Sequence, residues 1–256
     1  MKRFSGNRRI AGVAAAGLAV TLAGILMGST SSFFTDQDAK ANTFTTGDLD
    51  ITLREPEWDP KKDEDGKNLY PGCTLYKNPT IKNVTDEKKG AEPCYARMTI
   101  QILDNAGKEI TDTKTLDLVY QTIYYDKNFR SNGQTGEESS AGLIQGREPG
   151  YCLAELSDYP MVNPLWKKDE QRSKAACLVY NYQGTNGRGI LETGEESTLF
   201  TTIVIPTDWG NEQIQRLRDF RLSVTVQAIQ AVGFANMEEA QEAMDQLSGG
   251  INEEVL

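Results

Sequence analysis

Histidine is absent from all 256 residues of the chain. Without an imidazole side chain, the protein cannot build a His-liganded zinc site, a Ser-His-Asp triad or a Cys-His dyad from its own residues. Acidic residues are plentiful and could act in pairs as glycosidase carboxylates do, but their spacing singles out no such pair. Residues 63–66 weakly resemble a calcium loop, yet the required ligand spacing is missing. The sequence therefore predicts no enzyme, no cofactor and no metal site.

Basic residues are also scarce, with 27 Lys and Arg against 37 Asp and Glu and a net charge of −10. Four of the basic residues, Lys2, Arg3, Arg8 and Arg9, lie at the N-terminus, so a chain without them has 23 against 37 and a net charge of −14. We do not expect so acidic a chain to bind the phosphate backbone of nucleic acids. Its charge favours solubility and opposes self-association unless cations or backbone pairing compensate.

An uncharged stretch rich in Ala, Gly, Val and Leu follows the basic head, over residues 10–27. Small residues come next, as a signal peptidase requires at its −3 and −1 subsites. We therefore expect residues 1–32 to be a signal peptide cut between Ser32 and Phe33, which makes the signal peptidase a partner and the product a secreted protein. An uncleaved membrane anchor is the alternative, because a stretch of this length could just span a bilayer. Its weak hydrophobicity favours cleavage.

Four cysteines follow this segment: Cys73, Cys94, Cys152 and Cys177. An even number in an exported chain predicts two disulfides. Of the three connectivities, the local one joins Cys73 to Cys94 and Cys152 to Cys177 and closes loops of about 20 to 25 residues. Each loop would contribute roughly 3 kcal/mol in the chain-entropy model. A zinc site is less favoured because no Cys-x-x-Cys pair occurs.

Alternating apolar and polar residues predict strands, most clearly over residues 48–54, 94–103 and 221–229. Four further segments are expected to be strands: 74–84, 116–125, 177–182 and 198–205. In the first of these, Pro79 would break the strand or place it at a sheet edge.

Two segments favour helices. Residues 236–247 are expected to form a C-terminal helix with Asn236 as the cap and Glu239 at the third position, and 211–220 a short helix or turn. Residues 126–176 are expected to form a loop-rich insertion. The pattern of short strands predicts an all-β protein: one antiparallel β-sandwich domain over residues 33–256.

The stretch Phe34-Thr35-Asp36, followed by the segment from Asn42 to Ile51, resembles the TasA/camelysin family of exported Gram-positive proteins. Similar features are the turn at Leu69-Tyr70-Pro71-Gly72, the step at Lys82-Asn83 and the final strand from Leu222 to Gln230. The resemblance implies a jelly-roll-like sandwich, a dedicated ER-type signal peptidase and a structural role in the extracellular biofilm matrix. Some members are described as metalloproteases, but without histidine we see no chemistry for that activity here.

The resemblance also implies fibres that form by donor-strand complementation, in which the freed N-terminal segment of one subunit completes a sheet of the next. The main partner would then be a second copy of the chain, and an accessory matrix protein could take part. Phe33, Phe34 and Phe44 are the candidate anchors of the donor strand. Alternatives are a monomeric cell-surface adhesion or ligand-binding module whose N-terminus folds back, and a secreted hydrolase that uses acidic residues.

Overall fold

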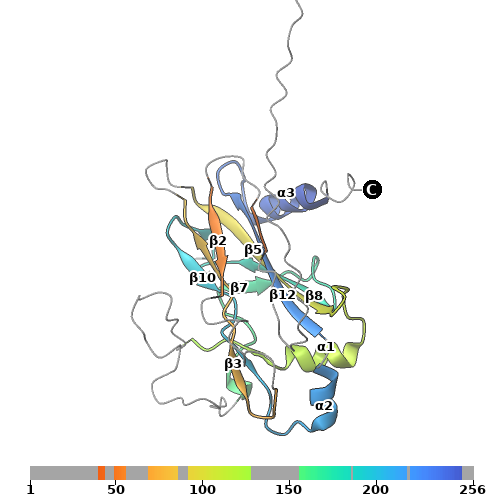
Figure 1. Ribbon diagram of the computed structural model, residues 1–256. Coiled ribbons are helices and arrows are strands. Elements are labelled where there is room, and N and C mark those ends of the chain that lie inside the picture. The colour runs from red at the N-terminus through yellow and green to blue at the C-terminus, as the bar shows by residue number, and fades with distance from the viewer. Residues whose placement is uncertain are drawn as a thin grey trace, which may run out of the picture. The chain divides into compact units, whose positions relative to one another are not determined.

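The computed structural model describes residues 40–43, 49–55, 69–85, 92–127, 156–185, 187–217 and 220–249 (Figure 1). Contacts within the chain divide it into two units, Met1–Thr30 and Ser31–Leu256. All of the described residues belong to the second unit.

The largest sheet is built on two strands of 11 residues each, β5 (Cys94–Asp104) and β12 (Phe220–Gln230). They pair antiparallel over their whole length, from Cys94 opposite Gln230 to Asp104 opposite Phe220. The far edge of β5 pairs with β8 (Cys177–Tyr182) and β9 (Ile190–Leu191), and β7 (Trp166–Lys168) pairs with β8. The far edge of β12 pairs with β1 (Lys40–Thr43), which runs parallel to it. β5 and β12 are thus the centre of a six-stranded sheet.

Two three-stranded antiparallel sheets complete the β structure of the described residues. The first has the order β10 (Glu196–Thr198), β4 (Thr80–Asn83), β2 (Ile51–Arg54), and the second has the order β3 (Thr74–Tyr76), β11 (Thr202–Val204), β6 (Ile123–Tyr124). Pro79 separates β3 from β4, which belong to different sheets, because proline cannot donate to a strand ladder. The predicted strand over 198–205 likewise divides between β10 and β11.

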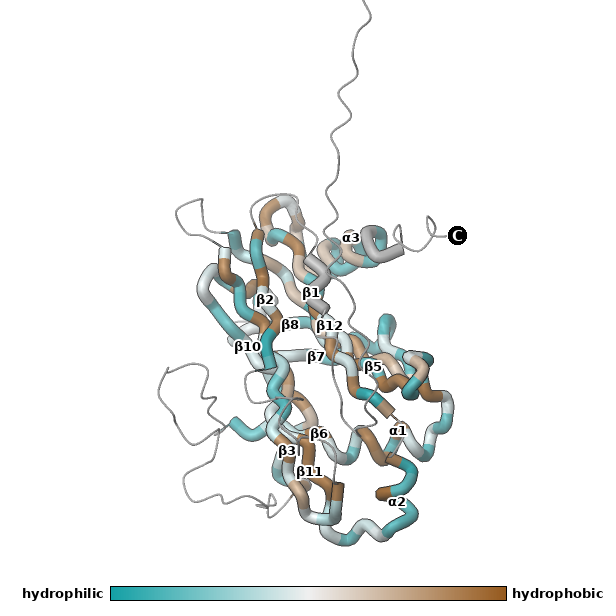
Figure 2. Tube along the Cα trace, in the orientation of Figure 1, coloured by the Kyte–Doolittle hydropathy of each residue, from teal (hydrophilic) through white to brown (hydrophobic). Residues whose placement is uncertain are grey.

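The core confirms the alternation seen in the two central strands. Ala96, Met98, Ile100 and Ile102 of β5 are all 0% exposed, as are Leu222, Val224, Val226 and Ala228 of β12. They belong to one hydrophobic cluster together with residues of the smaller sheets, among them Ile51, Ile81 and Ile203. Figure 2 shows this apolar colouring along the central strands. The all-β, antiparallel sandwich predicted from the sequence is confirmed.

One predicted strand is wrong. Residues 116–125 were expected to be extended, whereas α1 (Thr113–Tyr120) is a helix and only Ile123–Tyr124 forms a strand. Asp112 caps the helix by accepting hydrogen bonds from the Thr115 backbone N at 3.2 Å and from Thr115 Oγ1 at 2.6 Å. Leu116 and Val119, three residues apart, are both buried on the helix face. The cap and this spacing outweigh the β-branched and aromatic content of the segment.

The remaining helices of the described ranges are η3 (Leu156–Asp158), α2 (Asn211–Arg216) and α3 (Met237–Gly249). Asn236 caps α3 as predicted, since its Oδ1 accepts from the backbone N of Glu239 at 3.1 Å. The Glu239 carboxylate accepts from Ala235 N, one residue earlier than a capping box requires. None of the described helices is long and apolar enough to cross a membrane.

Candidate functional site

Several predicted site residues lie outside the described part of the chain: Ser32, Phe33, Phe34, Phe44 and Cys152. The cleavage site and the donor-strand anchors therefore stay predictions. The described segment that comes closest to them in sequence is β1, between Phe34 and Phe44.

β1 occupies the edge of β12 that β5 leaves open. Four residue pairs form a parallel ladder, from Lys40 opposite Thr225 to Thr43 opposite Ala228. Within the described residues, no strand pairs with this side of β12 over 221–224. A strand edge offers backbone N–H and C=O groups to an added strand. The structure thus shows that the described part of the N-terminal segment, β1, enters the main sheet at β12 and pairs with residues 225–228 of that edge.

The structure does not show the predicted disulfides. Cys94 and Cys177 carry free thiols in it, and Cys152 lies outside the described residues, so the pairing stays a prediction. Cys73 leads into β3 of one sheet, while Cys94 opens β5 of another, with Gln230 and Leu191 as its strand neighbours.

The Cys94 thiol is fully buried, and its Sγ lies 3.7 Å from the Leu191 carbonyl oxygen. Burial, with a smaller effect of the nearby carboxylates of Glu195 and Glu192, raises the pKa of Cys94 to about 12. Because the thiolate is the reactive form, we expect iodoacetamide at pH 8 to leave Cys94 unmodified in the folded protein and to modify it fully in denaturant. Half-buried Cys177 should react before it. Peptide mass spectrometry checks this, and rapid alkylation of Cys94 in the folded state would contradict it.

Metal chemistry finds no support in the described ranges, because no group of three or more Cys, Asp or Glu side chains there could hold a metal ion. Two charged side chains that the sequence pattern does not place in the interior have a structural role. Lys77 and Arg97 are buried, and both form ion pairs with carboxylates.

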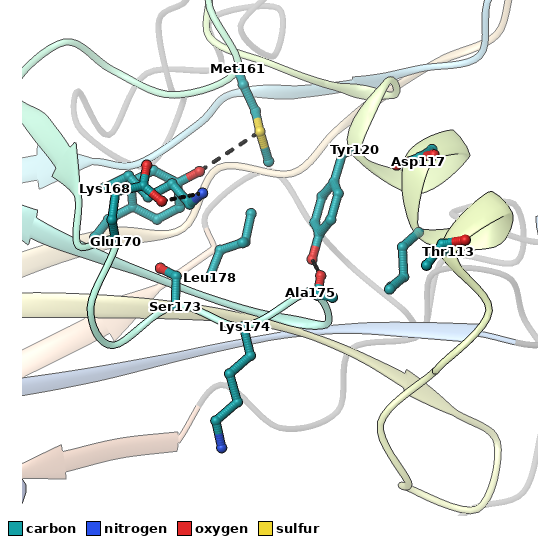
Figure 3. Close-up of a pocket in the computed structure, with 12 residues that line it drawn as sticks. Thr113, Asp117, Tyr120, Met161, Lys168, Glu170, Ser173, Lys174, Ala175 and Leu178 are labelled. Atoms are coloured by element: carbon teal, nitrogen blue, oxygen red, sulfur yellow. Dashed lines mark hydrogen bonds and ion pairs between the residues drawn. The ribbon is translucent and has the colours of Figure 1, made fainter.

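A groove of about 540 Å³ lies between α1 and the hairpin of β7 and β8. Figure 3 shows Tyr120 reaching from α1 toward Ala175 of the hairpin, where its hydroxyl donates to the Ala175 carbonyl oxygen. Burial raises the pKa of Tyr120, and burial together with Glu170 raises that of Tyr180 to about 12, so both phenols are neutral. Sequence patterns do not identify this groove, because its lining residues come from separate segments of the chain.

The comparisons with known proteins yield one match. The family model described as camelysin metallo-endopeptidase matches residues 7–90. The matched region begins in the predicted signal peptide and ends after β4, before the first long strand of the main sheet. No curated protein and no solved structure matches the chain.

Proposed function

We propose that the chain is a secreted structural protein of an extracellular matrix that polymerises head to tail through its N-terminal strand. The match of residues 7–90 to the camelysin family model supports the resemblance to the TasA/camelysin family. The observation that carries this proposal is the pairing of β1 with β12. Parallel neighbours cannot be joined by a tight turn. β1 lies at the edge of the main sheet and before all of its other strands in sequence, so the same segment of another copy could take its place on β12.

The register of β1 supports a longer pairing in the polymer. Each β1 residue lies opposite the residue 185 positions later in β12, as for Lys40 and Thr225. A donor strand continued toward the N-terminus in this register would set residues 36–39 opposite 221–224, the part of the edge that β1 leaves uncovered. Exchanging β1 and its preceding residues between copies is a domain swap that repeats from subunit to subunit.

Signal cleavage is the step that we propose to start assembly. Before cleavage, the segment next to Phe33 is held at the membrane by residues 1–32. After cleavage, residues 33–42 are free at one end and span roughly 33 Å when fully extended. Phe33, Phe34 and Phe44 would then anchor the donor strand through apolar contacts, which with the added backbone bonds offset repulsion between acidic subunits.

A monomeric surface module is the second candidate, and one observation favours it. In the structure, β1 pairs with β12 of the same chain, which is the folded-back arrangement that a monomer would use. Catalysis is not part of either proposal. The name metallo-endopeptidase belongs to the family model, and this chain has no histidine with which to build the usual protease zinc site.

Deleting residues 33–40 separates the two candidates. We expect the deletion variant to remain a soluble monomer with a cooperative thermal transition and to form no fibres, whereas the chain beginning at Phe33 forms fibres visible by electron microscopy. A variant lacking residues 251–256 is the matched control and should assemble normally. Adding the deletion variant to the intact chain should cap growing ends and shorten the fibres. Normal fibres from the deletion variant would refute strand exchange, and a monomeric intact chain would favour the surface module.

A further inference from the structure

We propose that the groove between α1 and the β7–β8 hairpin binds a neutral saccharide, one or two pyranose rings long. The inference goes beyond polymerisation and does not depend on it. The groove has a volume of about 540 Å³, within the range of roughly 300 to 1,000 Å³ that is typical of small-ligand sites.

The lining combines an apolar floor with polar ends. Leu116, Leu178 and Tyr180 line the groove and are only 3%, 8% and 4% exposed, so they form a rigid base. The Tyr120 ring is held by the hydrogen bond of its hydroxyl to Ala175 O. The C–H face of a pyranose is flat and apolar, so it can pack against the fixed Tyr120 ring and the buried apolar base of the groove.

The polar groups at the other end suit hydroxyl groups. Lys168 Nζ and Glu170 Oε2 form an ion pair at 2.9 Å, and their side chains are 38% and 76% exposed. Each therefore keeps hydrogen-bonding capacity toward the groove or the solvent. An ammonium beside a carboxylate can donate to one sugar hydroxyl and accept from the next.

Charge argues against an anionic ligand. The two lysines of the lining, Lys168 and Lys174, are balanced by Asp117 and Glu170, so the groove is locally neutral in a chain of net charge −10. Figure 3 shows the Lys174 side chain pointing away from the other lining residues. An anionic ligand would meet repulsion from the whole chain without a net positive charge in the groove to offset it.

Backbone geometry argues against a peptide that adds as a strand. The hairpin groups facing this region are already bonded: Lys174 N to Cys177 O at 2.7 Å, Asp169 N to Val179 O at 2.8 Å, and Val179 N to Ser173 Oγ at 2.9 Å. Strand addition needs unpaired backbone groups at an edge. A ligand that binds through side-chain contacts fits the groove better.

The test uses the chain from Phe33, ¹⁵N-labelled, with cellotetraose and chitotetraose as neutral probes and tetragalacturonate as the anionic one. We expect a neutral probe to shift the amide signals of Tyr120, Ser173 and Leu178 at concentrations of about 10 mM or below. Ala175→Trp, at an exposed position of the lining, should fill the groove and weaken binding at least tenfold without lowering the Tm. Glu212→Gln, on α2 and 81% exposed, is the control and should bind as the wild type does.

Each outcome decides the proposal. Shifts by a neutral probe that disappear in Ala175→Trp support it. No shift from either neutral probe, shifts that persist in Ala175→Trp, or tetragalacturonate binding as tightly as the neutral probes would each overturn it. Because the probes are soluble and the readout is local, failure of fibre formation would leave the result unaffected.

Discussion

Replacing Glu55 by alanine should lower the free energy of unfolding by about 3 to 5 kcal/mol, because it leaves a lysine charge buried with its carboxylate partner removed. Glu55 follows β2 and Lys77 follows β3, so their ion pair joins two of the three sheets. Lys77 Nζ lies 2.9 Å from Glu55 Oε1, and the two side chains are 0% and 8% exposed. A charge this deeply buried is costly once it loses its counter-ion.

The substitution pattern makes the prediction specific. Lys77→Met keeps most of the side-chain volume but leaves the Glu55 carboxylate buried without this lysine, so it should also be strongly destabilising, and the pair Glu55→Leu with Lys77→Met should recover much of the loss. Glu196→Ala breaks the exposed pair between Lys82 and Glu196, which are 3.7 Å apart and 36% and 31% exposed, and should cost below about 1 kcal/mol. Urea denaturation at pH 7 measures all four variants. Equal losses for Glu55→Ala and Glu196→Ala would contradict the buried-charge argument.

The central strands could be predicted from the sequence because each has one face that is entirely apolar and one that is polar. In β5 the apolar positions from Ala96 to Ile102 are all buried, as the period of two requires. A slip by one residue would place Arg97 and Thr99 in the core, so the pattern admits one register. Segments with such a pattern specify their own conformation.

Other features depend on contacts that sequence pattern does not encode. Arg97 belongs to the polar face of β5, which predicts exposure, yet it is 6% exposed because α3 packs over that end of the face. α1 is a helix although its β-branched and aromatic residues favour a strand, because the Asp112 cap and the spacing of Leu116 and Val119 outweigh that composition.

The candidate sites, too, include features that the sequence predicts and features that only the folded structure shows. The resemblance predicts that the N-terminal segment acts as a donor strand, and the structure shows β1 paired with β12 of the same chain in a defined register. The groove has no sequence signature, since its lining residues come from α1, Met161 and the β7–β8 hairpin. Side chains that meet only after folding could not be grouped beforehand.

The C-terminal helix is held on the sheet by a cluster of charges centred on Asp245. Its two carboxylate oxygens accept from Arg97 Nη1 at 2.5 Å and from Arg172 Nε at 2.7 Å. Arg172 also contacts Asp169 at 3.0 Å and Glu238 at 3.2 Å. Burial alone would raise the pKa of Asp245, but the hydrogen bonds and charges of the two arginines outweigh it and hold the pKa below its usual value of 3.8.

Asp245→Asn should therefore lower the free energy of unfolding by about 2 kcal/mol at pH 7, since hydrogen bonds to charged groups contribute roughly 1.5 to 3 kcal/mol and this carboxylate is partly solvated. The substitution leaves Arg97 buried against the neutral side chains of Gln227 and Gln241. Glu242→Gln, at an exposed position of the same helix, is the control and should change little.

The difference in the free energy of unfolding between the wild type and Asp245→Asn should decrease as the pH is lowered. A carboxyl group whose pKa is lower in the folded state stabilises the protein above its unfolded pKa, and this stabilisation is lost as pH falls through the folded pKa. The difference should thus be full at pH 7, shrink as pH falls below 3.8, and nearly vanish once Asp245 is protonated in both states. Urea denaturation at pH 7 and at acid pH measures it, and amide exchange of Ala240 and Met244 should show α3 opening first. A difference that stays constant down to the lowest pH at which the protein folds would mean that Asp245 acts through packing and not through its charge.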